Sequence, residues 1–415
     1  MYCEKCGAEN LDGAVYCCGC GEKIGEASKQ SNTAKVGAAI GTAADKLYEV
    51  TGGEGHAQLK FREFFSSVFK HHARGEAEEI FICGTATTTP DIKTVSAEWP
   101  RPWLWSRILV VLAVVIVLLG LLDLISTGSA TGAFSNGFIG ALVIPFAIMV
   151  FFFETNAPRN ISLPETLAIF FIGGVASLIV INLLPGNLLA AVTSGSDATG
   201  IEAVGVNLLA AFVMETAKVI VIVIALSLRG RHERNYILNG FLVGAAVGAG
   251  FLFFNSVADM FFQSVSGADT MFSATIALGL SAIGGPVAWG AVEGAVLALV
   301  NKKDEIQVGQ VANPMSLAAF MLTRPAFLVI FVLCIAFNTA WNTILPDATL
   351  DLVKLLVLVV AIWVVIMVML NRGLDEINEL NAKAEADAVE NTPSPFGTGS
   401  SPQTEMTEKE TVLAD

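Results

Sequence analysis

The chain has 415 residues, of which 54% are hydrophobic and only 15% are charged, and its mean hydropathy is +0.64. Soluble proteins with about half apolar residues carry roughly 25% charged residues, so this composition excludes an ordinary soluble domain and indicates a membrane protein. The net charge of −14, without a basic stripe, argues against nucleic acid as a partner.

The N-terminal segment is rich in cysteine, and two CxxCG turns lie at Cys3 to Gly7 and Cys17 to Gly21. Two thiolate pairs make the tetrahedral site that Zn²⁺ prefers, which predicts a structural zinc ribbon over residues 1–24. The expected ligands are Cys3, Cys6, Cys17 and Cys20. Cys18 does not keep the CxxC spacing. Unliganded or disulfide-bonded cysteines are the alternative, which a reducing cytosol disfavours.

Two further segments precede the first apolar run. Residues 25–60 are rich in Gly, Ala, Ser and Lys and predict a flexible linker, with a helical turn at Lys46 to Val50. Residues 61–103 are predicted to be a cytosolic juxtamembrane segment that begins with an amphipathic stretch of phenylalanines. The stretch from Trp99 to Trp105 contains three tryptophans, which is typical of the aromatic belt at a membrane surface.

Eight apolar runs are long enough to cross a hydrocarbon core of about 30 Å as helices. We therefore predict an all-α polytopic membrane domain over residues 104–370. The expected spans are Leu104 to Ile125, Ala133 to Phe153, Pro164 to Leu184, Val204 to Leu228, Tyr236 to Val257, Met271 to Leu299, Ala326 to Leu345 and Leu352 to Leu370. The sixth is longer than needed, so a tilt or a break near Gly284 to Pro286 is expected.

The positive charges predict the orientation of these spans. Lys and Arg follow the second, fourth and sixth spans, whereas the alternate loops, residues 126–132, 185–203, 258–270 and 346–351, contain none. The positive-inside rule then predicts a multi-pass protein of the cell membrane, with the lipid bilayer as partner and both termini in the cytosol. Met1 is not followed by a secretory signal, which agrees with a cytosolic N-terminus. Residues 371–415 are expected to form a short amphipathic helix and an acidic, disordered tail.

Ionisable residues at membrane depth are costly and point to function. Glu215 and Lys218 are three residues apart on one predicted helix, so they share a face and can neutralise each other. Glu293 is near the predicted cytosolic end of its span and is expected to be solvated. Three asparagines could tie helices together by hydrogen bonds: Asn255, Asn338 and Asn342.

The fifth span has a glycine every four residues, at Gly240, Gly244 and Gly248. A face of small residues allows two helices to approach closely, within one bundle or between two copies of a chain. Packing inside the bundle is the favoured interpretation.

Several motifs occur in order along the chain: Ile144-Pro145-Phe146, Met214 to Lys218, Asn235 to Gly240, Gly284 to Trp289, and Cys334 to Asn338. With them, most of residues 101–370 resembles the PrsW family of intramembrane metalloproteases. One branch of that family with a zinc ribbon is similar to the N-terminal part of the chain. The similarity lies in the Cys-rich module, the stretch from Glu78 to Thr85 and the Trp99-Pro100 pair before the first span. The resemblance implies a helical peptidase that uses zinc to cleave other membrane proteins.

The resemblance also assigns site positions. The family's activity is thought to need a Glu-Glu-x-x-Lys motif, a Glu after Gly-Phe on the next span, and one His on each of two later spans. The second Glu and the Lys are kept here as Glu215 and Lys218. The other positions fall on Met214, Asn255, Pro286 and Cys334, so most of the catalytic ligands are replaced.

The histidine content leads to the same expectation without the family. All four histidines lie outside the predicted spans, whereas a hydrolytic zinc site needs about three protein ligands and a bound water. The remaining anionic candidates are Glu215, Glu293 and Cys334, which argues against a catalytic zinc.

Three functions follow as hypotheses. The first is a degenerate PrsW-like protein that binds other membrane proteins, with the zinc ribbon as a cytosolic adaptor. The alternative is an active intramembrane metalloprotease with an altered site built on Glu215 and Cys334. A transporter or channel that uses the polar cluster is the third, and the absence of broken helices in two repeated halves disfavours it.

Overall fold

The computed structural model describes residues 6–9, 18–20, 32–125, 130–183, 203–229, 235–263, 281–301 and 323–390. Within these ranges the regular secondary structure is helical, and seven helices are long and apolar enough to cross a membrane. They are α4 (Leu104–Ile125), α5 (Ala130–Thr155), the interrupted helix α6, η2 and α7 (Leu163–Leu183), α9 (Val204–Arg229), α10 (Ile237–Gln263), α15 (Pro325–Asn342) and α16 (Ala348–Glu390). The prediction of an all-α polytopic membrane protein is confirmed.

The sixth predicted span differs from the other seven. Its described part is α12 (Pro286–Asn301), which has 16 residues and at 1.5 Å per residue is about 24 Å long. Residues 264–280 lie outside the described ranges. Pro286 suits the first helical position because proline has no N–H to leave unsatisfied there. The expected break near Gly284 to Pro286 is therefore confirmed.

The helix α10 lies at the centre of the bundle, and α4 lies at its edge. In the most apolar stretch of α10, 94% of the residues are buried inside the protein, whereas in α4 the share is 6%. Exposed valines and leucines, including Val111, Val117 and Leu121, cover α4 as expected for a helix in contact with lipid. The small residues of α10 let its neighbours come close on several sides.

Glycines join α10 to α12 along a seam in which the two backbones touch. A Cβ atom at Gly244 would overlap the carbonyl of Gly290, and one at Gly240 would overlap that of Gly294. On another side of α10, a Cβ at Gly250 would overlap the carbonyl of Phe170, in the π-helical turn η2 (Ile169–Gly173). The glycine face is thus used for packing inside the bundle, as favoured from the sequence.

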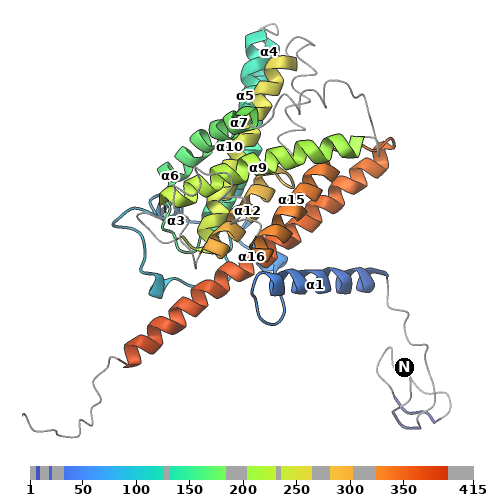
Figure 1. Ribbon diagram of the computed structural model, residues 1–415, viewed down its shortest axis with the longest axis vertical. Coiled ribbons are helices and arrows are strands. Elements are labelled where there is room, and N and C mark those ends of the chain that lie inside the picture. Colours follow the sequence, from blue (N-terminus) through green and yellow to red (C-terminus); the bar gives the residue numbers. More distant parts are fainter. Residues whose placement is uncertain are drawn as a thin grey trace, which may run out of the picture.

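Four short or peripheral helices precede the bundle: α1 (Asn32–Val50), α2 (Phe61–Phe64), α3 (Arg74–Phe81) and the 3₁₀-helix η1 (Ile92–Thr94). The prediction of a flexible linker over residues 25–60 is wrong for residues 32–50, which form α1. Figure 1 shows α1, in blue, beside the long orange helix α16. Ala44 and Tyr48 are buried there against Val368, because apolar residues four positions apart share one helix face.

Tyr48 fixes α1 to α16. Its hydroxyl donates a hydrogen bond to Asp375 and accepts one from the Asn371 amide at 3.0 Å. The Arg372 guanidinium lies 5.8 Å from the centre of the Tyr48 ring and donates from Nε to the carbonyl of Thr51 at 3.2 Å. Burial and the neighbouring Asp375 carboxylate raise the pKa of Tyr48 to about 12. The phenol therefore stays protonated, and able to donate, through the neutral pH range.

The last helix is longer than its span. The amphipathic helix expected after Leu370 is present as the end of α16, which continues to Glu390, so residues 371–390 are helical rather than a disordered tail. Leu374 and Ile377 of the predicted amphipathic helix are buried, and Asn381 donates to the carbonyl of Val95 at 3.0 Å. These contacts explain why the helix does not end at the membrane. Residues 391–415 lie outside the described ranges.

The glycine seam gives the first prediction. Gly244→Ala should force α10 and α12 apart and lower the thermal unfolding midpoint of the detergent-purified protein, since an oversized group in a tight contact costs about 1–3 kcal/mol. Gly120→Ala is the matched control, because a Cβ at Gly120 of α4 meets no atom within 4 Å. Equal midpoints for the two variants would mean that the seam is not closed in solution.

Candidate functional site

A buried cluster of charged and polar side chains lies between α9, α12 and α15. Glu215 and Lys218 come from α9, and both side chains are fully buried. Lys218 Nζ lies 2.5 Å from Glu215 Oε2, so the two residues form an ion pair on one helix face. Glu215 and Lys218 therefore neutralise each other, as their spacing predicted.

Asn338 of α15 completes the contacts of the Glu215 carboxylate. Its amide Nδ2 donates to Glu215 Oε1 at 2.5 Å. Asn342, one turn further along α15, donates to Asn338 Oδ1 at 2.6 Å. Asn338 therefore ties α15 to α9, as expected for an asparagine at membrane depth. Its partner, 123 residues away, could not be named from the sequence.

Glu293 of α12 corrects a prediction. We expected it to be solvated, but its exposed fraction is 0%. The helix begins only at Pro286, so Glu293 lies in the middle of α12 rather than close to a solvated end. It interacts electrostatically with both Glu215 and Lys218. Two carboxyl groups thus share one ammonium, and the cluster is neutral when one carboxyl carries a proton.

Trp289 and Cys334 close the cluster. Lys218 Nζ lies 5.3 Å from the centre of the Trp289 ring, within the range of a cation–π contact. The Cys334 thiol is fully buried and lies 3.9 Å from the carbonyl oxygen of Trp289. The glycine seam holds α12 against α10 and so fixes the position of Trp289 and Glu293 opposite α9 and α15.

The remaining positions assigned by resemblance have other surroundings. Asn255 donates to Asp259 Oδ2 at 3.1 Å, one turn away on its own helix, so it does not tie helices through this bond. Pro286 is the first residue of α12, two turns before Glu293. Met214 is half-buried beside Glu215 on α9. Of the six assigned positions, Glu215, Lys218 and Cys334 come together in the cluster.

The donor atoms of the cluster do not fit a hydrolytic zinc ion. In the parts of the chain that the structure describes, no group of three His, Cys, Asp or Glu side chains is arranged to hold a metal. The Lys218 ammonium lies against the Glu215 carboxylate, where a metal cation would otherwise bind it.

The N-terminal ribbon stays a prediction. Cys3 and Cys17 lie outside the described residues, while Cys6 and Cys20 are exposed. The thiol of Cys18 lies 3.5 Å from the carbonyl oxygen of Glu9.

The ion pair gives the second prediction. Lys218→Met should lower the stability of the detergent-purified protein by about 3–5 kcal/mol, because it leaves buried carboxyl groups without a cation. Adding Glu215→Gln should recover part of the loss. Lys46→Met, at an exposed lysine of α1, is the control for the change of residue type. A Lys218→Met protein as stable as the wild type would show that the pair is not buried.

Comparisons with known proteins agree with the resemblance. A family model described as PrsW family intramembrane metalloprotease matches residues 163–370, about half of the chain, and this region contains every residue of the cluster. No curated protein and no solved structure matches the chain. The chain belongs to the PrsW family of intramembrane metalloproteases.

Proposed function

We propose that this PrsW-family membrane domain binds transmembrane segments of other membrane proteins without cleaving them. The observation that carries the proposal is the ion pair between Glu215 and Lys218, completed by Asn338. A carboxylate held by an ammonium and an amide is poorly placed to bind a metal or to take a proton from water. The helix bundle around it keeps its close packing, so the fold remains available for binding.

The chemistry of hydrolysis supports the same proposal. A zinc peptidase needs about three ligands, an open coordination position and a general base. The candidate donors Glu215, Glu293 and Cys334 have no exposed surface. Two family positions that would supply carboxylates are Met214 and Asn255 here. The two that would supply imidazoles are Pro286 and Cys334.

The zinc ribbon completes the proposal as a cytosolic adaptor, with Cys3, Cys6, Cys17 and Cys20 as its ligands. A site with four protein ligands is closed, so its zinc holds a fold and performs no reaction. The short distance along the chain from the ribbon to α1 would place a bound partner close to the membrane domain.

Metal content gives the third prediction. The detergent-purified protein should contain one zinc per chain, and changing both Cys3 and Cys6 to Ser should remove it. Cys18→Ser is the matched control and should keep the zinc. Two zinc ions in the wild type, with one surviving in the double variant, would reveal a metal site in the bundle and contradict the proposal.

Cleavage in cells gives the fourth prediction. Membrane-protein fragments should be the same in cells with the wild type and with Glu215→Gln. A photocrosslinker at the exposed Val332 of α15 should trap partners at their full length. Fragments lost with Glu215→Gln, but retained with Glu379→Gln at an exposed glutamate of α16, would establish the protease instead.

A further inference from the structure

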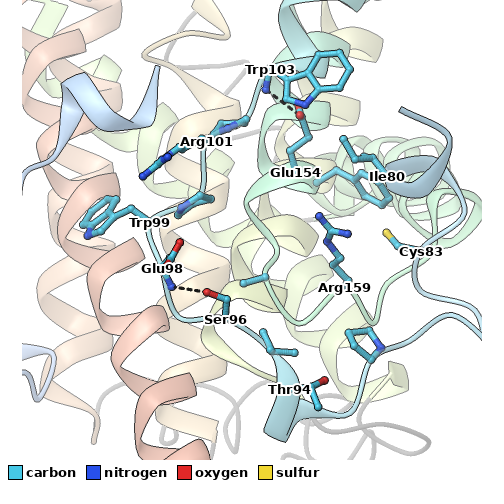
Figure 2. Close-up of a pocket in the computed structure, with 16 residues that line it drawn as sticks. Ile80, Cys83, Thr94, Ser96, Glu98, Trp99, Arg101, Trp103, Glu154 and Arg159 are labelled. Atoms are coloured by element: carbon cyan, nitrogen blue, oxygen red, sulfur yellow. Dashed lines mark hydrogen bonds between the residues drawn. The ribbon is translucent and has the colours of Figure 1, made fainter. Parts of the chain in front are cut away.

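A cavity of about 400 Å³ lies at the end of the bundle where α4 begins and α5 ends. Its walls come from the juxtamembrane segment and from the loop after α5. Figure 2 shows Arg101, Glu98 and Trp99 on one side and Arg159, Cys83 and Ile80 on the other. The cavity precedes the region that matches the family model, so its function is independent of the function proposed above.

The charges around the cavity leave a positive balance. Four charged side chains line it: Arg101, Arg159, Glu98 and Glu154. Glu154 Oε1 accepts hydrogen bonds from the backbone N–H groups of Trp103 and Leu104, at 2.9 and 2.8 Å, and Oε2 accepts one from Trp105 at 2.8 Å. These donors and the N-terminus of α4 compensate its charge. The other charged side chains of the lining are Arg101 and Arg159, on opposite sides of the cavity, and Glu98.

Arg159 lines the cavity from a loop with an unusual backbone conformation. Among the described residues Arg159 is the one non-glycine residue with a positive φ, at 47°. This conformation costs about 1–2 kcal/mol for an L-residue. The loop is anchored on both sides of it, since the Asn239 amide donates to Asn156 at 2.8 Å and to Asn160 at 2.6 Å. Figure 2 shows the guanidinium pointing into the space between Glu154 and Cys83.

The surroundings favour a lipid over a soluble anion. Trp99 and Trp103 line the cavity directly before the first span, at the level where headgroups lie. A second cavity of about 350 Å³ lies one helical turn deeper along α5 and is lined by apolar side chains, among them Phe151, Ile148 and Trp363. A phospholipid has its phosphate at the first of these depths and its acyl chains at the second.

We propose that the cavity binds the phosphodiester group of a membrane phospholipid between Arg101 and Arg159, with an acyl chain directed toward the apolar cavity. A phosphodiester carries one negative charge, which balances the two guanidinium groups and Glu98. Arginine is suited to this contact because its planar group donates two parallel hydrogen bonds to phosphate oxygens. Arg101 and Arg159 form no ion pair with another described residue, so both are available.

Cys83 is a built-in probe of occupancy. It is a free thiol on the wall of the cavity with an exposed fraction of 7%. Burial raises the pKa of this thiol, and the nearby Arg159 guanidinium opposes that increase. Alkylation needs both a thiolate and access, so a bound headgroup should slow it.

The experiment uses the full chain, freed of lipid in detergent, with Cys83 alkylation followed by mass spectrometry of its peptide. Dioctanoyl phosphatidylglycerol, at ten times its dissociation constant, should slow the reaction about tenfold. Dioctanoylglycerol and inorganic phosphate should have no effect. Equal protection by dioctanoylglycerol would indicate apolar binding alone, and equal protection by phosphate a soluble ligand. Either result, or no protection at all, would overturn the proposal.

Two variants test the arginines. Arg159→Gly removes the guanidinium but tolerates the positive φ, so the loop should keep its shape. Arg101→Ala removes the other guanidinium, which comes from the juxtamembrane segment and not from the loop after α5. In each variant lipid should no longer slow alkylation of Cys83. The readout is the ratio of rates with and without lipid, because Arg159 also changes the reactivity of the thiol itself. Arg62→Ala, an exposed arginine of α2 away from the cavity, should retain the protection. Protection that survives in both variants would contradict the assignment.

Discussion

Direct backbone contact between α10 and α12 is the constraint on which the rest of the membrane domain depends. Gly240 and Gly244 face Gly294 and Gly290 without room for a side chain. Because the two helices touch, α12 can lie inside the bundle although it has only 16 residues. That position brings Glu293 to the pair on α9 and leaves α10 surrounded on several sides. In lipid, where apolar surfaces gain little from association, such close packing is a main source of helix adhesion.

The buried charges are costly to hold inside the bundle. Removing charges from water in a protein interior costs several kcal/mol per ion, and only good geometry recovers it. The cluster achieves this through three helices: Lys218 and Glu215 from α9, Glu293 from α12 and Asn338 from α15. Such a network lowers the free energy of the one arrangement of these helices in which all of its contacts form. The network therefore agrees with the proposal that the bundle serves binding.

The sequence predicted what depends on local composition. Apolar runs placed most of the spans within a few residues, and the spacing of Glu215 and Lys218 predicted their pairing. Glu293 was misjudged because its depth was counted along a run that began at Met271, whereas the helix begins at Pro286. The helix α1 was missed because its Gly, Ala and Lys content is also typical of a linker, and its partner α16 is more than 300 residues away along the chain. The conformation of Arg159 could not be predicted either, since the loop around it is held by Asn239 of α10, about 80 residues further along the chain.

The junction at Tyr48 also has a consequence for biosynthesis. Tyr48 and its acceptor Asp375 are separated by 327 residues, a stretch that includes the whole membrane domain. At about 5–20 residues per second, a ribosome needs roughly 15–65 s to make the intervening chain. During that interval α1 has no docking site, and its apolar face is open to chaperones or to other chains. Completion of the last span therefore sets the earliest time at which the N-terminal segment becomes fixed.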